Sequence, residues 1–308
     1  KCKYCAFFSA ACTAPDWDKF ADGILREIQF WGVRLGRVAV PTVFFGGGTP
    51  SLMPTRVFAR IMNALRNNFN IAPNPEITLE SNPKTLDATR LREFMDAGVN
   101  RLSVGVQRLD NQELEFLGRR HNVRDAMQLL DVAMKMGLRV NADFIYGIPG
   151  DNADTVAQMC QDINALGLGH VSMYELTIEK NTPFGQMNLA MPSNDAMADM
   201  YCTIAGTLAL PRYEVSNYAT PGNECIHNQN VWDGDAYVGI GRGAAGRPYI
   251  DGTWYEQRGG DDIQMQPLTP SSRATEKIIT GLRTVRGVRK SDDVMRVINT
   301  DWLCANPE

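Results

Sequence analysis

Short apolar runs alternate with longer stretches of helical periodicity over the first 176 residues of the chain. The run Thr42-Val43-Phe44-Phe45 is typical of a buried strand, and three glycines follow it. By the same reasoning, further strands are predicted at 76–80, 101–106, 139–145 and 170–176, and helices at 17–35, 55–69, 86–97, 122–137 and 154–166. This alternation predicts parallel strands joined by crossover helices.

Both ends of the helix predicted at 122–137 are marked by residues that cap or end helices. Asn122 is a good N-cap, and Gly137 can end the helix in a left-handed conformation. Its apolar face is expected to include Ala126, Leu129, Leu130 and Met134.

Residues with chemical potential follow the carboxyl ends of successive predicted strands. They are Gly46-Gly47-Gly48-Thr49, Glu80-Ser81-Asn82-Pro83, Gln107, Asp143 and Tyr174-Glu175. An open doubly wound sheet and a barrel both fit the alternation, but in a parallel barrel these ends share one rim. We therefore favour a barrel whose rim carries a binding site. For any one of these residues, a hydrogen bond within the core is the competing explanation.

Composition narrows the class of protein. The chain has 308 residues, is 44% hydrophobic and carries a formal charge of −4, so it can bury a large core. No basic stripe indicates a nucleic-acid partner, and no apolar run is long enough to span a bilayer. Seven scattered cysteines and the lack of a secretory leader predict a reducing, cytoplasmic location. Because the chain opens on Lys-Cys without an initiator Met, we expect a fragment.

The first five residues, Lys1-Cys2-Lys3-Tyr4-Cys5, contain a C-x2-C pair. Such a pair can belong to a zinc site, a redox dithiol or an iron–sulfur cluster. Zinc normally needs a second Cys or His pair, and no other cysteine of this sequence has a close partner along the chain. A redox dithiol should lie between a strand and a long helix, which the residues after Cys5 do not predict. Taken alone, the pair leaves all three chemistries open.

Two glycine-rich stretches invite nucleotide-binding interpretations. The triplet at 46–48 lacks the Lys and Ser or Thr of a phosphate-binding loop. The stretch at 239–244 fits G-x-G-x-x-A, but no β-α-β unit surrounds it. We interpret the first as a loop that approaches a ligand closely and the second as a close-approach loop without a dinucleotide.

Several motifs in order resemble one family. They are Cys2-Lys3-Tyr4-Cys5, Gly46-Gly47-Gly48-Thr49-Pro50-Ser51, Glu80-Ser81-Asn82-Pro83, Gly105-Val106-Gln107, Gly118-Arg119-Arg120-His121, Ile145-Tyr146-Gly147-Ile148-Pro149-Gly150 and Tyr213-Glu214-Val215-Ser216-Asn217-Tyr218-Ala219. Together they look like the radical S-adenosylmethionine proteins of the oxygen-independent coproporphyrinogen III oxidase group. The match covers nearly the whole chain, and the series is far more specific than any one motif.

The resemblance implies a [4Fe-4S] cluster and S-adenosylmethionine as cofactors. The cluster motif of the family is C-x3-C-x2-C, in which Cys2 and Cys5 match the second and third ligands. The first ligand and the first barrel strand would then precede Lys1. The family match assigns to S-adenosylmethionine the residues Tyr4, Gly47, Gly48, Thr49, Glu80, Gln107, Arg119 and Asp143. Among them Arg119 would pair with the ligand carboxylate, and Arg120 is the alternative for that role.

The family has an oxidase branch and a heme-chaperone branch. Oxidases carry a further Cys where this chain has Phe7, whereas the chaperones carry H-N-x-x-Y-W. Here the motif reads His227-Asn228-Gln229-Asn230-Val231-Trp232, so Val231 replaces the Tyr. The resemblance therefore favours a chaperone that binds heme through His227, with a hemoprotein acceptor and an electron donor as partners. Porphyrinogen decarboxylation by an oxidase is the alternative, and His170 is expected to be structural.

The expected fold class is α/β, a partial (β/α)6 radical S-adenosylmethionine barrel with a smaller C-terminal domain. The barrel core is predicted at 1–190, and a flanking segment at 191–262 carries the His227 motif and the second glycine-rich loop. An incomplete C-terminal domain is predicted at 263–308. Within these parts we expect a helix at 195–210, a linker at 251–270 and a helix that begins at Ser272.

Overall fold

The computed structural model describes residues 1–9, 12–260, 262–295 and 297. The chain divides into two units, Lys1–Glu224 and Cys225–Glu308, and each is described by itself. The division predicted from sequence at residues 190 and 262 stays a prediction. The part of that prediction that concerns residues 296 and 298–308 lies outside the described residues.

The first unit holds most of the predicted elements. Its strands are β1 (Ala39–Phe45), β2 (Asn70–Ser81), β3 (Arg101–Gln107), β4 (Arg139–Tyr146), β5 (His170–Glu175) and β6 (Asn217–Ala219). Its helices are α1 (Trp17–Leu35), α2 (Thr55–Asn68), α3 (Ala88–Asp96), α4 (Asn111–Phe116), α5 (Val123–Lys135), α6 (Ala153–Ala165) and α7 (Asn194–Thr207), with 3-10 turns at Pro50–Leu52, Pro83–Thr85 and Phe184–Gln186.

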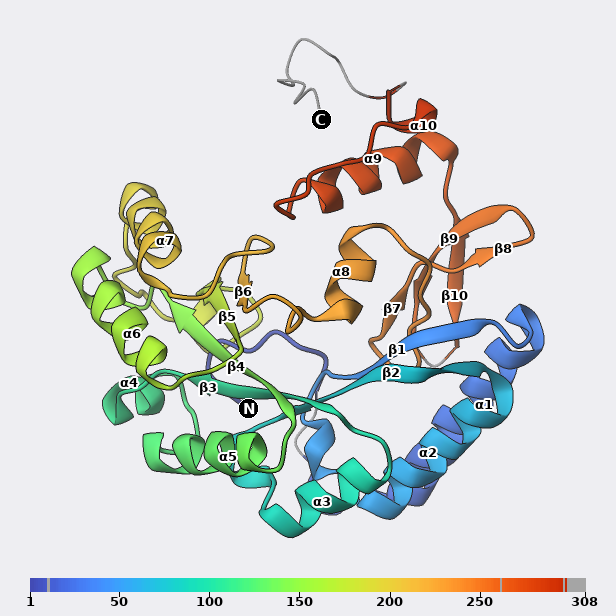
Figure 1. The fold of residues 1–308 in the computed structure, drawn as a ribbon, viewed down its shortest axis with the longest axis horizontal. Coiled ribbons are helices and arrows are strands. Elements are labelled where there is room, and N and C mark those ends of the chain that lie inside the picture. The colour runs from blue at the N-terminus through green and yellow to red at the C-terminus, as the bar shows by residue number, and fades with distance from the viewer. Residues whose placement is uncertain (10–11, 261, 296, 298–308) are drawn as a thin grey trace. The chain divides into compact units, whose positions relative to one another are not determined.

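These strands form one sheet in the order β1-β2-β3-β4-β5-β6. The first five are parallel, and β6 pairs antiparallel with β5. Every residue of β3 is buried, as expected for a central strand covered on both faces. The connecting helices α2, α3, α5 and α6 lie along the outer side of the curved sheet (Figure 1). The predicted α/β barrel class is thereby confirmed.

Strand register gathers polar side chains on one face of the sheet. Glu80 lies beside Ser103, Ser103 beside Asn141, and Asn141 beside His170. Two residues further on, Gly105, Asp143, Ser172 and Asn217 form the next row. Because alternate residues of a strand point to the same face, both rows project to the side of the sheet that carries Glu80.

Helix α5 confirms most of its predicted pattern. Asn122 caps it in a reciprocal capping box with Asp125. Three of the four residues predicted for its apolar face are buried, but Met134 is 37% exposed, so that part of the prediction is wrong. The buried position belongs to Ala133, seven residues after Ala126, because two turns of helix return to the same face.

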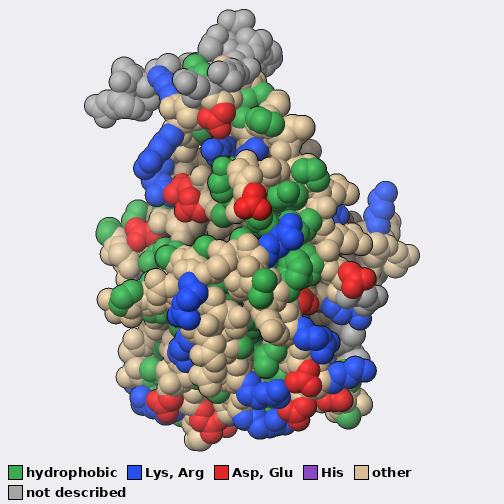
Figure 2. Space-filling view, turned by 90° about the vertical axis from the view of Figure 1, so that its right-hand side faces the viewer, with side chains coloured by type: hydrophobic (Ala, Val, Ile, Leu, Met, Phe, Trp, Pro, Cys, Tyr) green, Lys and Arg blue, Asp and Glu red, His purple; other side chains and the backbone are tan. Residues whose placement is uncertain are grey.

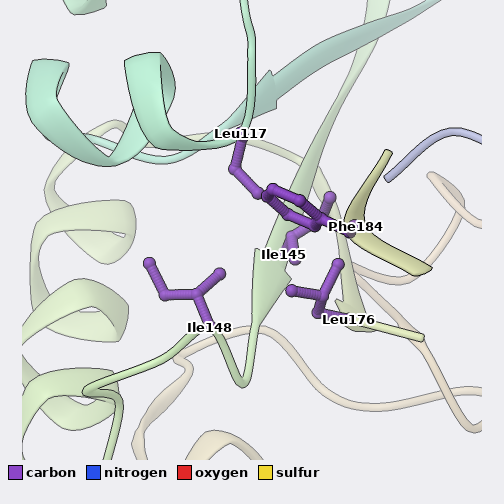
Figure 3. Packing of buried hydrophobic residues seen from close by; sticks show 5 residues of the cluster. All are labelled: Leu117, Ile145, Ile148, Leu176 and Phe184. Atoms are coloured by element: carbon purple, nitrogen blue, oxygen red, sulfur yellow. The ribbon is translucent and has the colours of Figure 1, made fainter. Parts of the chain in front are cut away.

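A hydrophobic cluster supports the amino-terminal segment. Figure 3 shows its buried members, which are Leu117, Ile145, Ile148, Leu176 and Phe184. Tyr4 packs against this cluster. The loop after β4 is held by the buried Asp151 carboxylate, which accepts hydrogen bonds from the Gly147 and Ile148 amides and pairs with the Arg108 guanidinium. The Cys2–Cys5 segment is therefore supported by closely packed side chains.

The second unit corrects one prediction. It contains α8 (Ile226–Trp232), β7 (Ala245–Gly246), β8 (Tyr249–Ile250), β9 (Thr253–Arg258), β10 (Gln264–Pro267), α9 (Pro270–Gly281) and α10 (Asp292–Met295). Residues 251–270 were predicted as a linker, but β9 and β10 form an antiparallel hairpin there. Asp251 and Gly252 form the turn before β9, and Gly259 and Gly260 follow its end, whereas its start, Thr253-Trp254-Tyr255, favours strand.

Charges on the surface are mixed. Figure 2 shows acidic and basic side chains interspersed on one face of the molecule. Ion pairs also join α1 to α2, where Asp18 contacts Arg56 and Arg60. Among the described residues, no helix is long and apolar enough to cross a membrane.

Candidate functional site

The two cysteines of the C-x2-C pair lie on one tight turn. The Cys5 amide donates to the Cys2 carbonyl at 3.3 Å, and both thiols are free and partly exposed. Lys3, between them, is fixed on both sides of its backbone: its amide donates to Leu117 O, and its carbonyl accepts from Phe184 N. This approach requires Gly118, because a Cβ there would lie 3.0 Å from the Lys3 side chain, in a backbone with φ of 75°.

Arg119 connects the cysteine turn to the strand ends. One guanidinium nitrogen lies 3.4 Å from Cys2 Sγ and 3.4 Å from the Tyr4 hydroxyl oxygen. The other donates to the Asn82 side chain and, at 2.6 Å, to the Gly105 carbonyl. Asn82 in turn donates to Thr49 Oγ1 at 3.1 Å. The predicted residues Cys2, Tyr4, Thr49 and Arg119 therefore belong to one hydrogen-bonded group.

The first glycine-rich loop folds over Glu80. The Gly47 amide donates to Glu80 Oε2 at 2.9 Å, and Gly47 has a φ of 111°, which favours glycine. A Cβ on Gly46 would lie 2.8 Å from the Phe44 ring and 3.0 Å from Glu80 Oε1. Gly48 faces Ser9, whose Cβ lies 3.3 Å from where a Gly48 Cβ would be. These glycines permit close approach of the backbone to Glu80 and Phe44. The predicted approach to a ligand stays a prediction.

Gln107 and Asp143 complete the set on β3 and β4. Gln107 is buried and has a φ of 74°, a strained conformation for a residue with a side chain. Its amide nitrogen lies near Gly105, beside the Arg119 guanidinium. Asp143 accepts hydrogen bonds from Asn141 and Ser103, and burial raises its pKa. Such strain at a cluster of polar groups is typical of functional sites.

The electrostatics of this group keep Tyr4 neutral and leave Glu80 poised to titrate. Burial raises the pKa of Tyr4, and the effect outweighs the opposing charge of Arg119. Burial, and then the Asp143 carboxyl, raise the pKa of Glu80 to about 7. Two partly buried carboxyl groups near a guanidinium can hold a cationic or hydroxyl-bearing ligand.

Glu80→Gln is expected to remove a pH dependence from folding stability. Because the folded chain binds the Glu80 proton more tightly than the unfolded chain, Glu80 lowers the free energy of unfolding as pH rises from about 4.5 to about 7. At about 1.4 kcal/mol per pKa unit, the full change is on the order of 3 kcal/mol. Urea unfolding of parent and variant across this window measures it. Parallel pH profiles for the two proteins would contradict the assignment.

The donor set fits the cofactors that the resemblance implies. Arg119 Nε is buried and has no hydrogen-bond partner among the described residues, so a donor remains for a bound anion. Cys2 and Cys5 supply two soft ligands on one turn beside it. The described residues hold no group of three or more His, Cys, Asp or Glu side chains suited to a metal ion. This chain therefore presents two free thiols on one turn, next to an arginine with a donor to spare.

Some predicted residues lie apart from this group. Glu175 ends β5 and is exposed. Tyr174 before it is partly exposed, but burial and then the Asp143 carboxyl raise the pKa of its hydroxyl, which therefore lies beside the group rather than apart from it. His227 lies on α8 in the second unit. On the same helix, Trp232 has the Arg283 guanidinium carbon 4.6 Å from its ring centroid, and its indole N–H is buried without a partner among the described residues.

The second glycine-rich stretch behaves as predicted. Gln257 exchanges two hydrogen bonds with the Gly239 backbone, and a Cβ on Gly239 would lie 2.5 Å from the Ala245 carbonyl oxygen. The strand β7 follows the stretch, whereas a dinucleotide-binding loop opens a helix. It is a close-approach loop.

Sequence reasoning missed the residues that hold the site together. Asn82 bridges Arg119 and Thr49, and Ser103 and Asn141 bind Asp143. Asn82 belongs to the motif Glu80-Ser81-Asn82-Pro83, but no individual role was predicted for it. Their signal was weak, because polar residues inside strands usually satisfy core hydrogen bonds. His170, predicted to be structural, is buried with both ring nitrogens bonded.

Comparisons with known proteins agree with this geometry. The family model of the radical SAM superfamily matches residues 1–163. The heme chaperone HemW of Escherichia coli (strain K12) is 36% identical over 255 residues, which are 80% of this chain and 67% of that protein. HemW of Lactococcus lactis is 32% identical over 306 residues, or 93% of this chain and 79% of that protein. A zebrafish (Danio rerio) relative, the mitochondrial radical S-adenosyl methionine domain-containing protein 1, is 34% identical over 91% of this chain and 66% of its own length.

Among solved structures, coproporphyrinogen III oxidase (HemN) from Escherichia coli has a TM-score of 0.78. It is 20% identical, and the match covers 92% of this chain and 72% of that chain. At this identity the likeness concerns the fold. The chain spans 66% to 79% of the length of these relatives.

Proposed function

The chain belongs to the radical SAM superfamily and, within it, to the HemW-like proteins, and from this premise we propose that it is a heme chaperone that binds a [4Fe-4S] cluster and S-adenosylmethionine. The observation that carries the proposal is the convergence of the Cys2–Cys5 turn, the glycine-rich loop and Glu80 through Arg119. When bound, the cluster and S-adenosylmethionine supply one-electron chemistry.

The residues of the first unit divide the work of holding these cofactors. Cys2 and Cys5 provide two of the thiolates, and the family motif places a third four residues before Cys2. Arg119 binds the ligand carboxylate, with its remaining Nε–H available as a donor. Gly47, Gly48 and Thr49 present backbone and hydroxyl groups to the methionine moiety. Glu80, Gln107 and Asp143 orient its other polar groups.

Tyr4 connects the cysteine turn to the hydrophobic cluster. Its side chain packs against the cluster that Figure 3 shows, and its hydroxyl oxygen lies 3.4 Å from an Arg119 guanidinium nitrogen. A neutral Tyr4 hydroxyl adds no charge beside the thiolates. Exclusion of water strengthens the Arg119 interaction, because charges attract more strongly in a low dielectric.

Heme binding is assigned to α8. A neutral imidazole is a good axial ligand for heme iron, which suits His227, and Trp232 on the same helix can cover an apolar macrocycle face. The names of the bacterial relatives support this role. Phe7, where the oxidase branch has a further Cys, also supports the chaperone.

His227→Ala is expected to abolish a heme absorption band that the parent shows after titration with hemin. The protein is prepared with cluster and S-adenosylmethionine, and Gln229→Ala on the same helix serves as the matched control. A parallel assay follows conversion of coproporphyrinogen III to protoporphyrinogen. Turnover, with heme binding absent or indifferent to His227, would instead establish the oxidase.

A hemoprotein acceptor and an electron donor complete the proposal. Both follow from the family assignment, since a chaperone must release heme and a cluster must be reduced. A cytoplasmic location is also proposed. It is supported by the odd number of scattered cysteines, which are free in the described part of the chain.

A further inference from the structure

A hydrogen-bonded chain runs from Tyr213 to Asp143 through the buried side chains of His170 and Asn141. The Tyr213 hydroxyl lies 2.7 Å from His170 Nε2, and His170 Nδ1 lies 2.6 Å from Asn141 Oδ1. Asn141 Nδ2 then lies 2.8 Å from Asp143 Oδ1. Adjacent register on β4 and β5 places Asn141 beside His170, so the chain is a product of strand pairing.

The donors and acceptors available on these groups allow the hydrogen bonds to run in one direction only. Asn141 Nδ2 donates to the Asp143 carboxylate and to Ser103 Oγ, at 2.8 Å each, and Ser103 then donates to the second Asp143 oxygen at 3.0 Å. The amide oxygen of Asn141 must therefore point the other way, toward His170 and Ser172. An acceptor there requires a donor from His170, which places the ring proton on Nδ1.

His170 carries that one proton only. Burial, and next the charge of Arg101, lower its pKa well below the ordinary value, so the ring is neutral. With Nδ1–H given to Asn141, Nε2 accepts from the Tyr213 hydroxyl. The opposite tautomer would set the lone pair of Nδ1 against Asn141 Oδ1. The amide would then turn its oxygen toward the Asp143 carboxylate, where two acceptors repel.

We propose that His170 and Asn141 are positioning residues of the S-adenosylmethionine site, in which the Nδ1–H tautomer of His170 fixes the Asn141 amide and thereby keeps Asp143 an acceptor for a donor group of the ligand. The role of Asp143 toward the ligand rests on the proposed function. The tautomer and the amide orientation rest on the contacts alone.

The tautomer is tested on the protein without ligand. The chain has three histidines, so ¹⁵N-labelled histidine gives three ring spin systems, assigned by His121→Phe, His170→Phe and His227→Phe. We expect His170 to show a protonated Nδ1 and an unprotonated Nε2 throughout the neutral range. A protonated Nε2, alone or in an imidazolium, would overturn the proposal.

The effect on the site is tested with two tyrosine variants. Tyr213→Phe removes the hydroxyl that binds His170, whereas Tyr218→Phe removes a buried hydroxyl with no hydrogen-bond partner among the described residues. Thermal unfolding controls for general loss of stability in both. We expect only Tyr213→Phe to shift the His170 ring nitrogens and to weaken S-adenosylmethionine binding, by about threefold or more. Equal ligand affinity in both variants would overturn the positioning role.

Asn141→Leu gives the larger effect because it removes the donor to Asp143 itself. Calorimetric titration of the cluster-loaded protein should show affinity for S-adenosylmethionine reduced about tenfold or more. Parental affinity in a folded Asn141→Leu protein would reject the proposal. A parent that does not bind S-adenosylmethionine would refute the proposed function instead, while the tautomer measurement would still decide the orientation of Asn141.

Discussion

Replacing either Cys2 or Cys5 with serine is expected to abolish the iron–sulfur cluster. A [4Fe-4S] cluster in this family is held by three thiolates, so the loss of one leaves two ligands and a site open to solvent. The protein is prepared with the first cysteine of the family motif in place, four residues before Cys2, and reconstituted anaerobically. Iron and sulfide analysis should fall from about four of each per chain to background.

Cys202→Ser is the matched control, because Cys202 is a free, exposed thiol on α7 outside the motif. It should retain full iron and sulfide content. Stoichiometric zinc without labile sulfide in the parent would show that the pair belongs to a different metal site. Far-ultraviolet circular dichroism of the same preparations distinguishes a folded chain that has lost its cluster from a misfolded one.

Arg119→Met is expected to weaken S-adenosylmethionine binding by about 30-fold or more. Removing one partner of a buried, hydrogen-bonded charge pair costs about 2 kcal/mol or more, and 1.4 kcal/mol is tenfold in affinity. Methionine keeps much of the length and apolar stem, so the loss reports the guanidinium. Calorimetric titration measures the affinity, and cluster content is measured in parallel because Arg119 also contacts Cys2.

Two further variants sharpen the test. Arg120 is exposed, whereas Arg119 meets Cys2, Tyr4, Asn82 and Gly105, so Arg120→Met should bind like the parent. Arg119→Lys should fall between the two, because an ammonium keeps the charge but loses the forked geometry. Weak binding in Arg120→Met with normal binding in Arg119→Met would reassign the carboxylate partner.

The regular part of the fold follows from local pattern. The strand of Thr42 to Phe45 and the capped helix after Asn122 were predicted because apolar period and capping chemistry act over a few residues. The β9–β10 hairpin was not, since turn-rich composition masked two short strands that depend on each other for pairing. The prediction that Met134 lies on the buried face of α5 was wrong for a different reason. One helical step of 100° separates a buried position from an exposed one.

The residues of the candidate site also fall into two groups, those that the local sequence marks and those that only the tertiary structure reveals. Cys2, Glu80 and Arg119 were predicted because motif order and strand ends mark them. The assignment of Asn82 and Asn141 needs the register of neighbouring strands, which the sequence does not show. The Gln107 backbone conformation is a tertiary property as well, because only surrounding contacts hold a side-chain-bearing residue there.

The anchoring of Lys3 has a thermodynamic consequence for assembly of the holoprotein. Its amide and carbonyl are engaged with Leu117 and Phe184, so contacts outside the turn itself order the segment that carries both thiols. Ordering a backbone residue costs about 1–2 kcal/mol, and here tertiary contacts offset that cost in advance. The free energy of metal binding is therefore not reduced by the cost of folding a loop, whereas in zinc fingers it is.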